Sequence, residues 1–189
     1  MTGKELIYKK LDTLQETPIV HESTKPLLED INHYFSNIPL FTRFGMPGVR
    51  KTLVVGPPGT GKTSLSIKIA QKFKTEKCVA FATDIATVAQ HIAKCAQHKM
   101  STIVILEDAE SSLSYANSSL LNFLDGVDLP KNTQGSYIIL TTNHPDQIED
   151  RIAKRPGRID KIIEFGNLRG EYALKCAEIY FKDILYQDD

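Results

Sequence analysis

The sequence contains few cysteines, and their spacing does not match a known metal site. Only three occur among the 189 residues, at Cys78, Cys95 and Cys176. Because none belongs to a C-x-x-C pair, the spacing indicates neither a zinc site nor a framework of disulfides. Reduced, buried thiols are the better interpretation, and they favour a cytoplasmic or equivalent reducing compartment.

The sequence also lacks any long apolar segment. The N-terminal stretch MTGKELIYKKLDTLQE carries charges throughout and contains no apolar core of the kind found in a secretory signal peptide. No run approaches the roughly 18 consecutive apolar residues that a membrane-spanning helix needs. We therefore expect neither a signal peptide nor a transmembrane segment.

Neither sign of charge is in excess. Lysine and arginine total 23, aspartate and glutamate total 23, and the formal net charge is zero. A broad nucleic-acid-binding face is therefore not indicated, although a local basic patch is compatible with this balance. The hydrophobic content of 41% and the charged content of 24% are typical of a soluble globular protein. A length of 189 residues suits one domain, or one domain plus a fragment of another.

Apolar segments of strand length alternate with segments of helical periodicity along most of the chain. We expect strands at 51–55, 77–83, 101–108, 136–143 and 160–165. We expect helices at 24–36, 62–73, 84–98, 117–127, 146–154 and 169–186, with a helix or flexible arm at 4–16. A polar loop is expected after residue 108. The alternation predicts an α/β fold with a mainly parallel sheet.

The stretch VVGPPGTGKTS at 54–64 is richer in glycine and proline than a simple turn requires. Gly56, four further residues, then Gly61, Lys62 and Thr63 fit the phosphate-binding pattern G-x-x-x-x-G-K-[ST]. Without a Cβ atom, glycine lets backbone N–H groups curl around an anion. A glycine-rich turn that binds nothing is the weaker alternative, since four fixed positions match. We predict a nucleotide site formed by Gly56, Pro57, Pro58, Gly59, Thr60, Gly61, Lys62, Thr63 and Ser64.

The residue types within this loop have separate expected roles. The Lys62 ammonium can reach the terminal phosphates of a nucleotide, and the Thr63 hydroxyl can ligate Mg²⁺. The helix that begins near Lys62 adds unpaired N–H groups and a partial positive charge. Pro57 and Pro58 fix φ and stiffen the approach to the loop.

Two acids follow the apolar strand that ends near residue 106. Glu107 and Asp108 would emerge at the carboxyl end of a central strand, in the crevice where such sheets bind ligands. One carboxylate can hold Mg²⁺, usually through water, and the other can orient the attacking water. Two solvated acids that close a strand are the alternative. Asn143 could hold the same water or the γ-phosphate, or it could belong to an ordinary turn before HPD.

Four segments in this order resemble the AAA ATPases over residues 37–166: GPPGTGKTS, IVILEDAE, LLNFLDGVD and ILTTNHPDQIEDRIAKRPGRID. They are most similar to the branch containing the mitochondrial Rieske-protein translocase, a complex III assembly ATPase in which the acidic pair also reads Glu-Asp. The resemblance implies a P-loop NTPase core with a five-stranded parallel sheet in the order 5-1-4-3-2. It also implies ATP or ADP and Mg²⁺ as ligands, and a homo-oligomeric ring of six or seven subunits.

The resemblance also divides the chain. It implies an N-terminal arm or helix over 1–22 and an ATPase core domain over 23–166. The segment 167–189 is expected to be the start of a helical lid or a C-terminal helix, so that the lid domain is absent or truncated.

The resemblance assigns roles to five residues by their positions in these motifs. Glu107 matches the acid on the Mg²⁺ side, Asp108 the acid that activates water, and Asn143 the family's sensor asparagine. Arg155 and Arg158 match two arginines that reach the neighbouring subunit's nucleotide, with the intervening Pro-Gly turn presenting them outward. An arginine fork stabilises charge on a transferring phosphoryl group. Surface salt bridges are the alternative for both arginines.

The sequence departs from the family pattern at three points. Between residues 81 and 101 we expect one helix and no aromatic-glycine pore loop, which argues against threading of unfolded chains. Asp108 is one methylene shorter than the usual glutamate, which predicts slow hydrolysis. The tail RGEYALKCAEIYFKDILYQDD matches at most the first helix of the lid, so no lid sensor arginine is identified.

The adenine pocket of the family begins just before the first core helix, so Ile19, Val20 and His21 are candidates for contacts with the base. The resulting prediction is a Mg²⁺-dependent ATPase module that assembles into a ring and remodels a protein partner. One alternative is a nucleotide-gated assembly switch with little turnover. Another is a DNA-associated loader, which the zero net charge and the lack of an interleaved basic-aromatic stretch disfavour.

Overall fold

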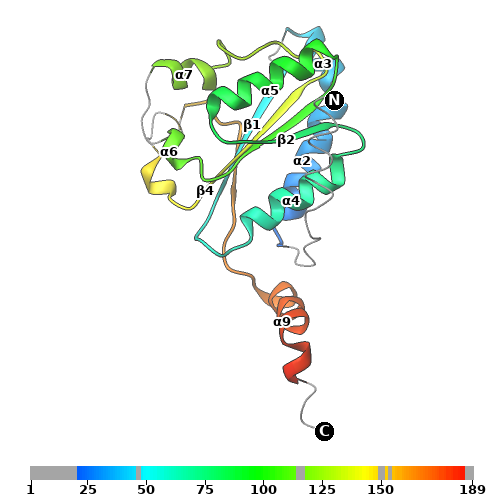
Figure 1. The fold of residues 1–189 in the computed structure, drawn as a ribbon, viewed down its shortest axis with the longest axis vertical. Helices are drawn as coiled ribbons and strands as arrows, with labels where there is room; N and C mark the ends of the chain where they lie inside the picture. The colour runs from blue at the N-terminus through cyan, green and yellow to red at the C-terminus, as the bar shows by residue number, and fades with distance from the viewer. Residues whose placement is uncertain (1–20, 46–47, 114–117, 149–151, 153–154, 186–189) are drawn as a thin grey trace.

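A computed structural model describes residues 21–45, 48–113, 118–148, 152 and 155–185 (Figure 1). Its strands are β1 (Val49–Val55), β2 (Cys78–Ala82), β3 (Thr102–Leu106), β4 (Ser136–Thr142) and β5 (Lys161–Glu164). Its helices are α2 (Thr24–Ser36), α3 (Ile38–Arg43), α4 (Lys62–Phe73), α5 (Ile85–Gln97), α6 (Glu110–Leu113), α7 (Ser118–Leu124) and α9 (Gly170–Leu185), with a 3₁₀ turn η1 (Pro145–Gln147). Among these described helices, none is long and apolar enough to cross a membrane.

The five strands form one sheet in the order β2-β3-β4-β1-β5, and every neighbouring pair is parallel. Read from the other edge, this is the predicted order 5-1-4-3-2, so the predicted fold class is confirmed. Strand β3 is buried at every position. A strand with continuous apolar residues is stable there because helices cover both faces of a parallel sheet.

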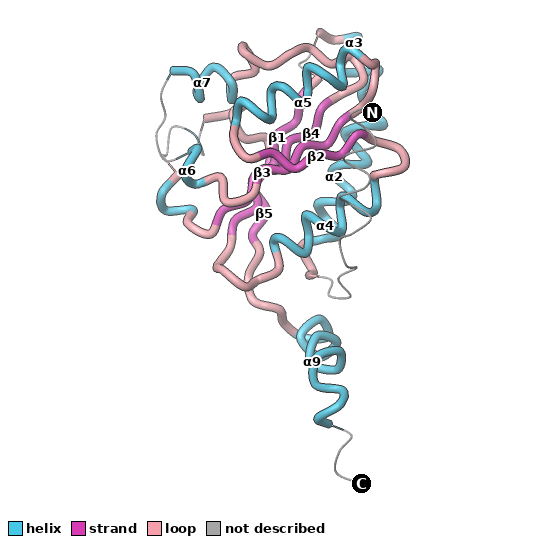
Figure 2. Tube along the Cα trace, viewed as in Figure 1, coloured by secondary structure: helices cyan, strands magenta, loops and turns pink. Residues whose placement is uncertain are grey.

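The helices lie in two layers around the sheet (Figure 2). Because successive side chains of a strand point to opposite faces, odd and even positions of β3 and β4 belong to different cores. Ile103, Ile105 and Ile139 pack with α2, α3 and α4, whereas Val104, Ile138 and Leu140 pack with α5, α6 and α7. Helix α9 follows β5 and extends away from this body, with Leu174 and Phe181 exposed (Figure 1).

Each strand predicted from the sequence is found, with ends shifted by a few residues. Two short helices that the sequence did not predict have local causes. Helix α3 was not predicted, and it begins after Asn37 with a proline in its first turn. The polar loop predicted after residue 108 contains α6, a short helix that buries Leu113. The predicted arm at 4–16 lies outside the described residues, as does most of the predicted helix at 146–154.

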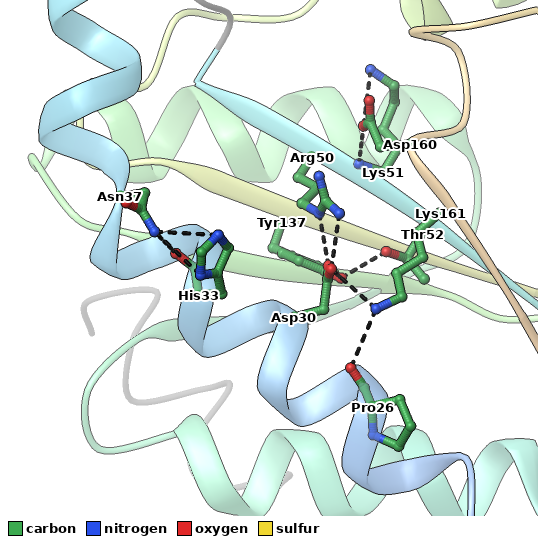
Figure 3. Close-up of polar contacts among 10 residues, drawn as sticks. All are labelled: Pro26, Asp30, His33, Asn37, Arg50, Lys51, Thr52, Tyr137, Asp160 and Lys161. Atoms are coloured by element: carbon green, nitrogen blue, oxygen red, sulfur yellow. Dashed lines mark hydrogen bonds and ion pairs between the residues drawn. The ribbon is translucent and has the colours of Figure 1, made fainter.

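One buried carboxylate fastens helix α2 to three strands (Figure 3). Asp30 accepts two hydrogen bonds from Arg50, at 2.7 and 2.8 Å, one from the Tyr137 hydroxyl at 2.6 Å, and one from Lys161 Nζ at 3.1 Å. The Asp30 side chain is 10% exposed. Burial alone would raise the pKa of Asp30, but these bonds outweigh burial and lower the pKa to about 2.

The low pKa of Asp30 predicts how its contribution to stability depends on pH. A carboxyl group whose pKa is lower in the folded chain stabilises that chain above its unfolded pKa, and the stabilisation is lost as pH falls toward the folded value. We expect Asp30→Asn to lower the free energy of unfolding by about 1–3 kcal/mol at neutral pH. The difference in free energy of unfolding between wild type and variant should stay constant down to about pH 4 and become smaller toward pH 2. Urea unfolding across this range measures it, with the exposed neighbour Glu29→Gln as control. A gap that is independent of pH would contradict this account.

The end of β1 makes a close contact with the end of β5. A Cβ atom added to Gly56 would lie 2.0 Å from the carbonyl oxygen of Phe165, which is closer than atoms can approach. Phe165 N donates to Val55 O at 2.7 Å, and Gly56 N donates to Thr142 O at 3.3 Å. Gly56 therefore keeps the chain after β1 between its two neighbouring strands.

This contact predicts that Gly56→Ala destabilises the fold even without any ligand. The methyl group must displace backbone and not a flexible side chain, so we expect a loss of about 1–3 kcal/mol. Gly166→Ala is a matched control, because a Cβ atom at Gly166 meets nothing within 4 Å. That control should change stability by less than about 0.5 kcal/mol. Equal thermal unfolding of the two variants would show that the contact does not constrain the strand ends.

Candidate functional site

The loop at residues 56–61 joins the end of β1 to the first residue of α4. Gly59 and Gly61 have φ values of 79° and 98°, in the left-handed region that favours glycine. A Cβ atom at either position would meet nothing within 4 Å, so backbone conformation and not space requires these glycines. Helix α4 begins directly after Gly61 without a side-chain cap. The loop therefore presents the N–H groups of the first helical turn to a ligand.

Lys62 lies beneath this loop and is 6% exposed. Its ammonium donates to the carbonyl oxygens of Gly56 and Pro57, both at 2.7 Å, and to the Thr60 hydroxyl at 3.4 Å. Burial lowers the pKa of Lys62, and the nearby charges of Asp108 and Glu110 partly offset that effect. The positive charge is thus fixed at the base of the loop by its own carbonyl groups.

An open cleft of about 390 Å³ lies beside the loop. It brings together residues from three strand ends and from the start of α4. Its lining residues are Pro58, Gly59, Gly61, Lys62, Thr63, Ser64, Asp108, Thr141 and Asn143. Most of the predicted phosphate-loop residues therefore share one cleft with the predicted water-activating acid and the predicted sensor asparagine.

Asp108 is held in a strained conformation at the edge of this cleft. Its φ is 49°, a left-handed value that costs a residue with a Cβ atom about 1–2 kcal/mol. The side chain of Asn143 donates to Asp108 Oδ1 at 2.9 Å, and Asp108 N donates to the Thr141 hydroxyl at 3.2 Å. Strand β4 therefore fixes both the backbone and the carboxylate of Asp108.

Glu107 occupies a more buried position than Asp108, and it is not among the residues that line the cleft. Among the described residues, Glu107 Oε1 and Glu110 Oε2 are buried side-chain oxygens without a hydrogen-bond donor. Such oxygens are suited to a hard cation or to its bound water.

These residues fit Mg²⁺ bound with phosphate and water but not an all-protein metal site. No group of three potential His, Cys, Asp or Glu ligands occurs within the described part of the chain. Mg²⁺ typically keeps several waters and takes one or two carboxylates together with substrate phosphates. Thr63 and Glu107 are the side chains that would hold it here, partly through water.

A second cavity, of about 310 Å³, shares Gly59, Gly61 and Ser64 with the cleft beside the phosphate loop. Its lining combines the phosphate loop with the residues around the start of α2, the segment after β5 and helix α9. The lining residues are His21, Thr24, Gly59, Thr60, Gly61, Ser64, Leu65, Lys68, Phe165, Leu168 and Cys176. Aromatic and aliphatic walls beside polar backbone are typical of a site for a flat base.

Both ring nitrogens of His21 are already bound within the chain. His21 Nε2 donates to Gly166 O at 2.9 Å, and Nδ1 accepts from Ser23 N at 3.0 Å. The ring also stacks on Phe165 with 3.9 Å between the centroids. His21 therefore forms a fixed wall of the cavity. Ile19 and Val20, the other predicted base contacts, lie outside the described residues.

The two predicted finger arginines differ in their surroundings. Arg155 is 61% exposed, and its guanidinium approaches Asp125 only to 3.9 Å. Arg158 is 3% exposed and donates to both carboxylate oxygens of Asp125, at 2.9 and 3.0 Å. The hydrogen bond to Arg158 is the largest cause that lowers the pKa of Asp125. The prediction that both arginines face outward is therefore wrong for Arg158, because a carboxylate of its own chain binds it.

Several residues around the site were not identified from the sequence. Phe165, Leu168 and Cys176 line the base-sized cavity, although they follow the last strand and carry no motif. Asp125 lies in the segment LLNFLDGVD, directly after the apolar helix α7. An acid at that position is the one sequence feature that could have indicated its ion pair with Arg158.

Comparison with known proteins identifies the family. Residues 45–167 match the family described as "ATPase family associated with various cellular activities (AAA)". The probable mitochondrial chaperone bcs1 of Schizosaccharomyces pombe is 30% identical over 165 residues, which cover 78% of this chain and 35% of that protein. The mitochondrial chaperone BCS1 of Homo sapiens is 29% identical over 154 residues, covering 71% and 35%.

A second group of relatives carries a different name. The proteasome-activating nucleotidase of Saccharolobus solfataricus is 26% identical over 207 aligned residues, covering 98% of this chain and 52% of that protein. The chain thus spans about a third of the length of the BCS1 chaperones and about half that of the nucleotidase. The resemblance to AAA ATPases and to their mitochondrial branch is confirmed by these matches. With the parallel sheet order and the match over more than half of its length, this chain belongs to the AAA family of ATPases.

Proposed function

We propose that this chain binds ATP with Mg²⁺ at the loop of residues 56–61, hydrolyses it, and uses the cycle in a ring that remodels a protein partner. The observation that carries the proposal is the shared cleft. A buried lysine, an acid held by an asparagine and an uncapped helix N-terminus surround it. This combination suits a nucleoside triphosphate, because fixed N–H groups and the Lys62 charge face the phosphates.

In this proposal the two cavities beside the loop bind different parts of the nucleotide. The phosphates lie in the cleft with Lys62, Thr63 and Asp108, and the base lies against Phe165 and His21. Gly59, Gly61 and Ser64 line both cavities, so one molecule can extend across the loop.

The acids have separate tasks in this proposal. The hydrogen bond from Asn143 to Asp108 Oδ1 fixes the rotation of that carboxylate, which can then take a proton from the attacking water. Glu107, whose buried Oε1 has no hydrogen-bond donor among the described residues, would hold Mg²⁺ directly or through water. Mg²⁺ when bound would supply positive charge that neutralises the phosphates.

This division predicts different kinetic defects for two conservative substitutions. Asp108→Asn should keep Mg·ATP binding but lower turnover by about 10²-fold or more, because a general base contributes at least that much. Glu107→Gln should instead raise the Mg²⁺ concentration that half-maximal activity requires. Phosphate release and equilibrium binding of ATP, both titrated with Mg²⁺, separate the two effects. Lys62→Ala is the control that loses binding itself. An Asp108→Asn variant with normal turnover, or an exchange of the two phenotypes, would refute the assignment.

Arg155 is the better candidate to act on a neighbouring subunit's nucleotide. Its exposed guanidinium is only loosely paired, whereas Arg158 is held by Asp125 within its own chain. We therefore assign the trans contact to Arg155. The Arg158–Asp125 pair anchors the segment that carries Arg155.

Subunit mixing tests this assignment. Arg155→Ala should lower turnover by about 10³-fold, as expected for an arginine finger. Mixing Arg155→Ala subunits with Lys62→Ala subunits should restore activity, because an intact Lys62 site can then face an intact Arg155. Turnover of the wild type should rise more than linearly with protein concentration until rings form.

Arg158 supplies the matched control. Arg158→Ala and Asp125→Ala should both lower stability, and the double variant should be little worse than either one, because the two side chains form one interaction. If Arg158→Ala but not Arg155→Ala is rescued by mixing, the two roles must be exchanged. A rate strictly proportional to concentration, with no rescue, would refute the trans arginine.

The short connection between β2 and α5 bears on how a partner would be handled. Only residues 83 and 84 join these elements, and Asp84 caps α5 by accepting from Thr87 N at 2.7 Å. Two small polar residues offer no aromatic group to grip an extended chain. This argues against a mechanism in which an unfolded chain is threaded through the ring.

A nucleotide-gated switch with little turnover is the second candidate. It is favoured by Asp108, whose short side chain is bound by Asn143 and whose backbone is strained. Tight ATP binding and nucleotide-dependent assembly without phosphate release would support this candidate over the first.

A further inference from the structure

The Asp30 cluster contains no residue of the phosphate cleft, and it joins helix α2 to three strands (Figure 3). Thr24 of α2, and Phe165 directly after β5, line the base-sized cavity. The donors to Asp30 come from β1, β4 and β5. The Tyr137 hydroxyl also contacts the Thr52 hydroxyl at 2.6 Å, so the cluster continues into the sheet. One carboxylate thereby sets the position of α2 against three adjacent strands.

Helix α2 begins next to the cavity. Thr24 N donates to His21 O at 2.9 Å, in the turn that leads into the helix, and both residues line the cavity. Asp30 lies six residues after Thr24, which is roughly 9 Å along a helix at 1.5 Å per residue. Because His21 is hydrogen-bonded to the first residue of this helix, a displacement of α2 at Asp30 would displace His21 as well.

Phe165, which follows β5, stacks on His21 with 3.9 Å between the ring centroids, so the two rings form one wall of the cavity. Lys161, at the start of β5, donates to Asp30 and also reaches Pro26 O at 3.4 Å. Further along, Ser23 Oγ donates to Glu164 O at 2.8 Å, and His21 donates to Gly166 O at 2.9 Å. A row of polar contacts thus joins α2 and its lead-in to β5, from Asp30 at one end to His21 at the cavity.

We propose that Asp30 is a positioning residue that holds α2 against β5, so that the stacked His21 and Phe165 rings form a fixed wall of the cavity, and that it thereby sets the affinity for the base of a nucleotide without touching it. The inference rests on the proposed binding of ATP and adds a determinant of base recognition to it. The ionic bonds of Asp30 hold α2 against the sheet on the side of the base, whereas the phosphate loop is held by Lys62 and its own carbonyl groups. The two halves of the site are therefore separable by experiment.

Comparison of ATP with inorganic tripolyphosphate makes the separation measurable, because tripolyphosphate has the phosphates but no base. In Asp30→Asn the dissociation constant for Mg·ATP should rise about tenfold, while that for Mg·tripolyphosphate should change by less than about twofold. His21→Ala should show the same selective loss. Glu29→Gln, an exposed acid on the same helix, should change neither constant.

A second variant covers the case in which Asp30→Asn does not fold. Lys161→Gln removes the β5 end of the row and leaves the bonds from Arg50 and Tyr137 to Asp30 in place. It should weaken ATP binding by a smaller factor, again without an effect on tripolyphosphate. Calorimetric titration of the folded variants gives both constants.

The outcomes separate this inference from the proposed function. If wild type binds neither ligand, or if Lys62→Ala binds both as wild type does, the proposed nucleotide site is wrong. Alternatively, wild type binds ATP and tripolyphosphate, while the Asp30 and Lys161 variants lose affinity for the two ligands equally, or for neither ligand. In that case the positioning role of Asp30 is wrong and the nucleotide site stands.

Discussion

The parallel pairing of β1 with β4, and of β4 with β3, is the constraint on which the site depends. Val55 pairs with Thr142, and Leu106 pairs with Leu140. Because parallel strands end at the same edge, the loop after β1, the acids after β3 and the asparagine after β4 meet there. A one-residue slip would turn every buried side chain to the other face and would also separate Asp108 from Asn143.

Within this sheet, hydrogen bonds from the chain itself hold the polar groups of the site. Lys62 is bound by the loop, Asp108 by β4, and Arg158 by Asp125. Preorganised charges of this kind are effective because they need little rearrangement when charge develops on a phosphoryl group. The cost is visible as backbone strain at Asp108. Arg155, which we assign to the neighbouring subunit's site, is by contrast largely exposed.

Most of the fold and the phosphate side of the site could be predicted from the sequence, because both depend on patterns of residues that are contiguous in the chain. The apolar strands and the loop from Gly56 to Thr63 are local signals, and the structure brings the predicted Asp108 and Asn143 into one cleft. The reason for Gly56 was only partly predicted. It was expected to admit an anion, and the structure shows that it also avoids the Phe165 carbonyl group.

Contacts between distant segments could not be predicted in this way. The Asp30 cluster draws on four separate segments, and nothing in a single sequence indicates that Tyr137 or Lys161 would face that carboxylate. The burial of Arg158 depends on Asp125, 33 positions away. Likewise, the engagement of both His21 nitrogens by Gly166 and Ser23 follows from how α2 meets β5.

The central claim is that one nucleotide extends across the loop, with its phosphates in the cleft and its base in the second cavity. A crystal structure of the chain with Mg²⁺ and a non-hydrolysable ATP analogue tests it most directly. We expect a terminal phosphate within hydrogen-bond distance of Lys62, a metal beside Thr63, and a base packed against the wall that the stacked His21 and Phe165 rings form. A nucleotide bound away from the loop, or a base outside the second cavity, would contradict it.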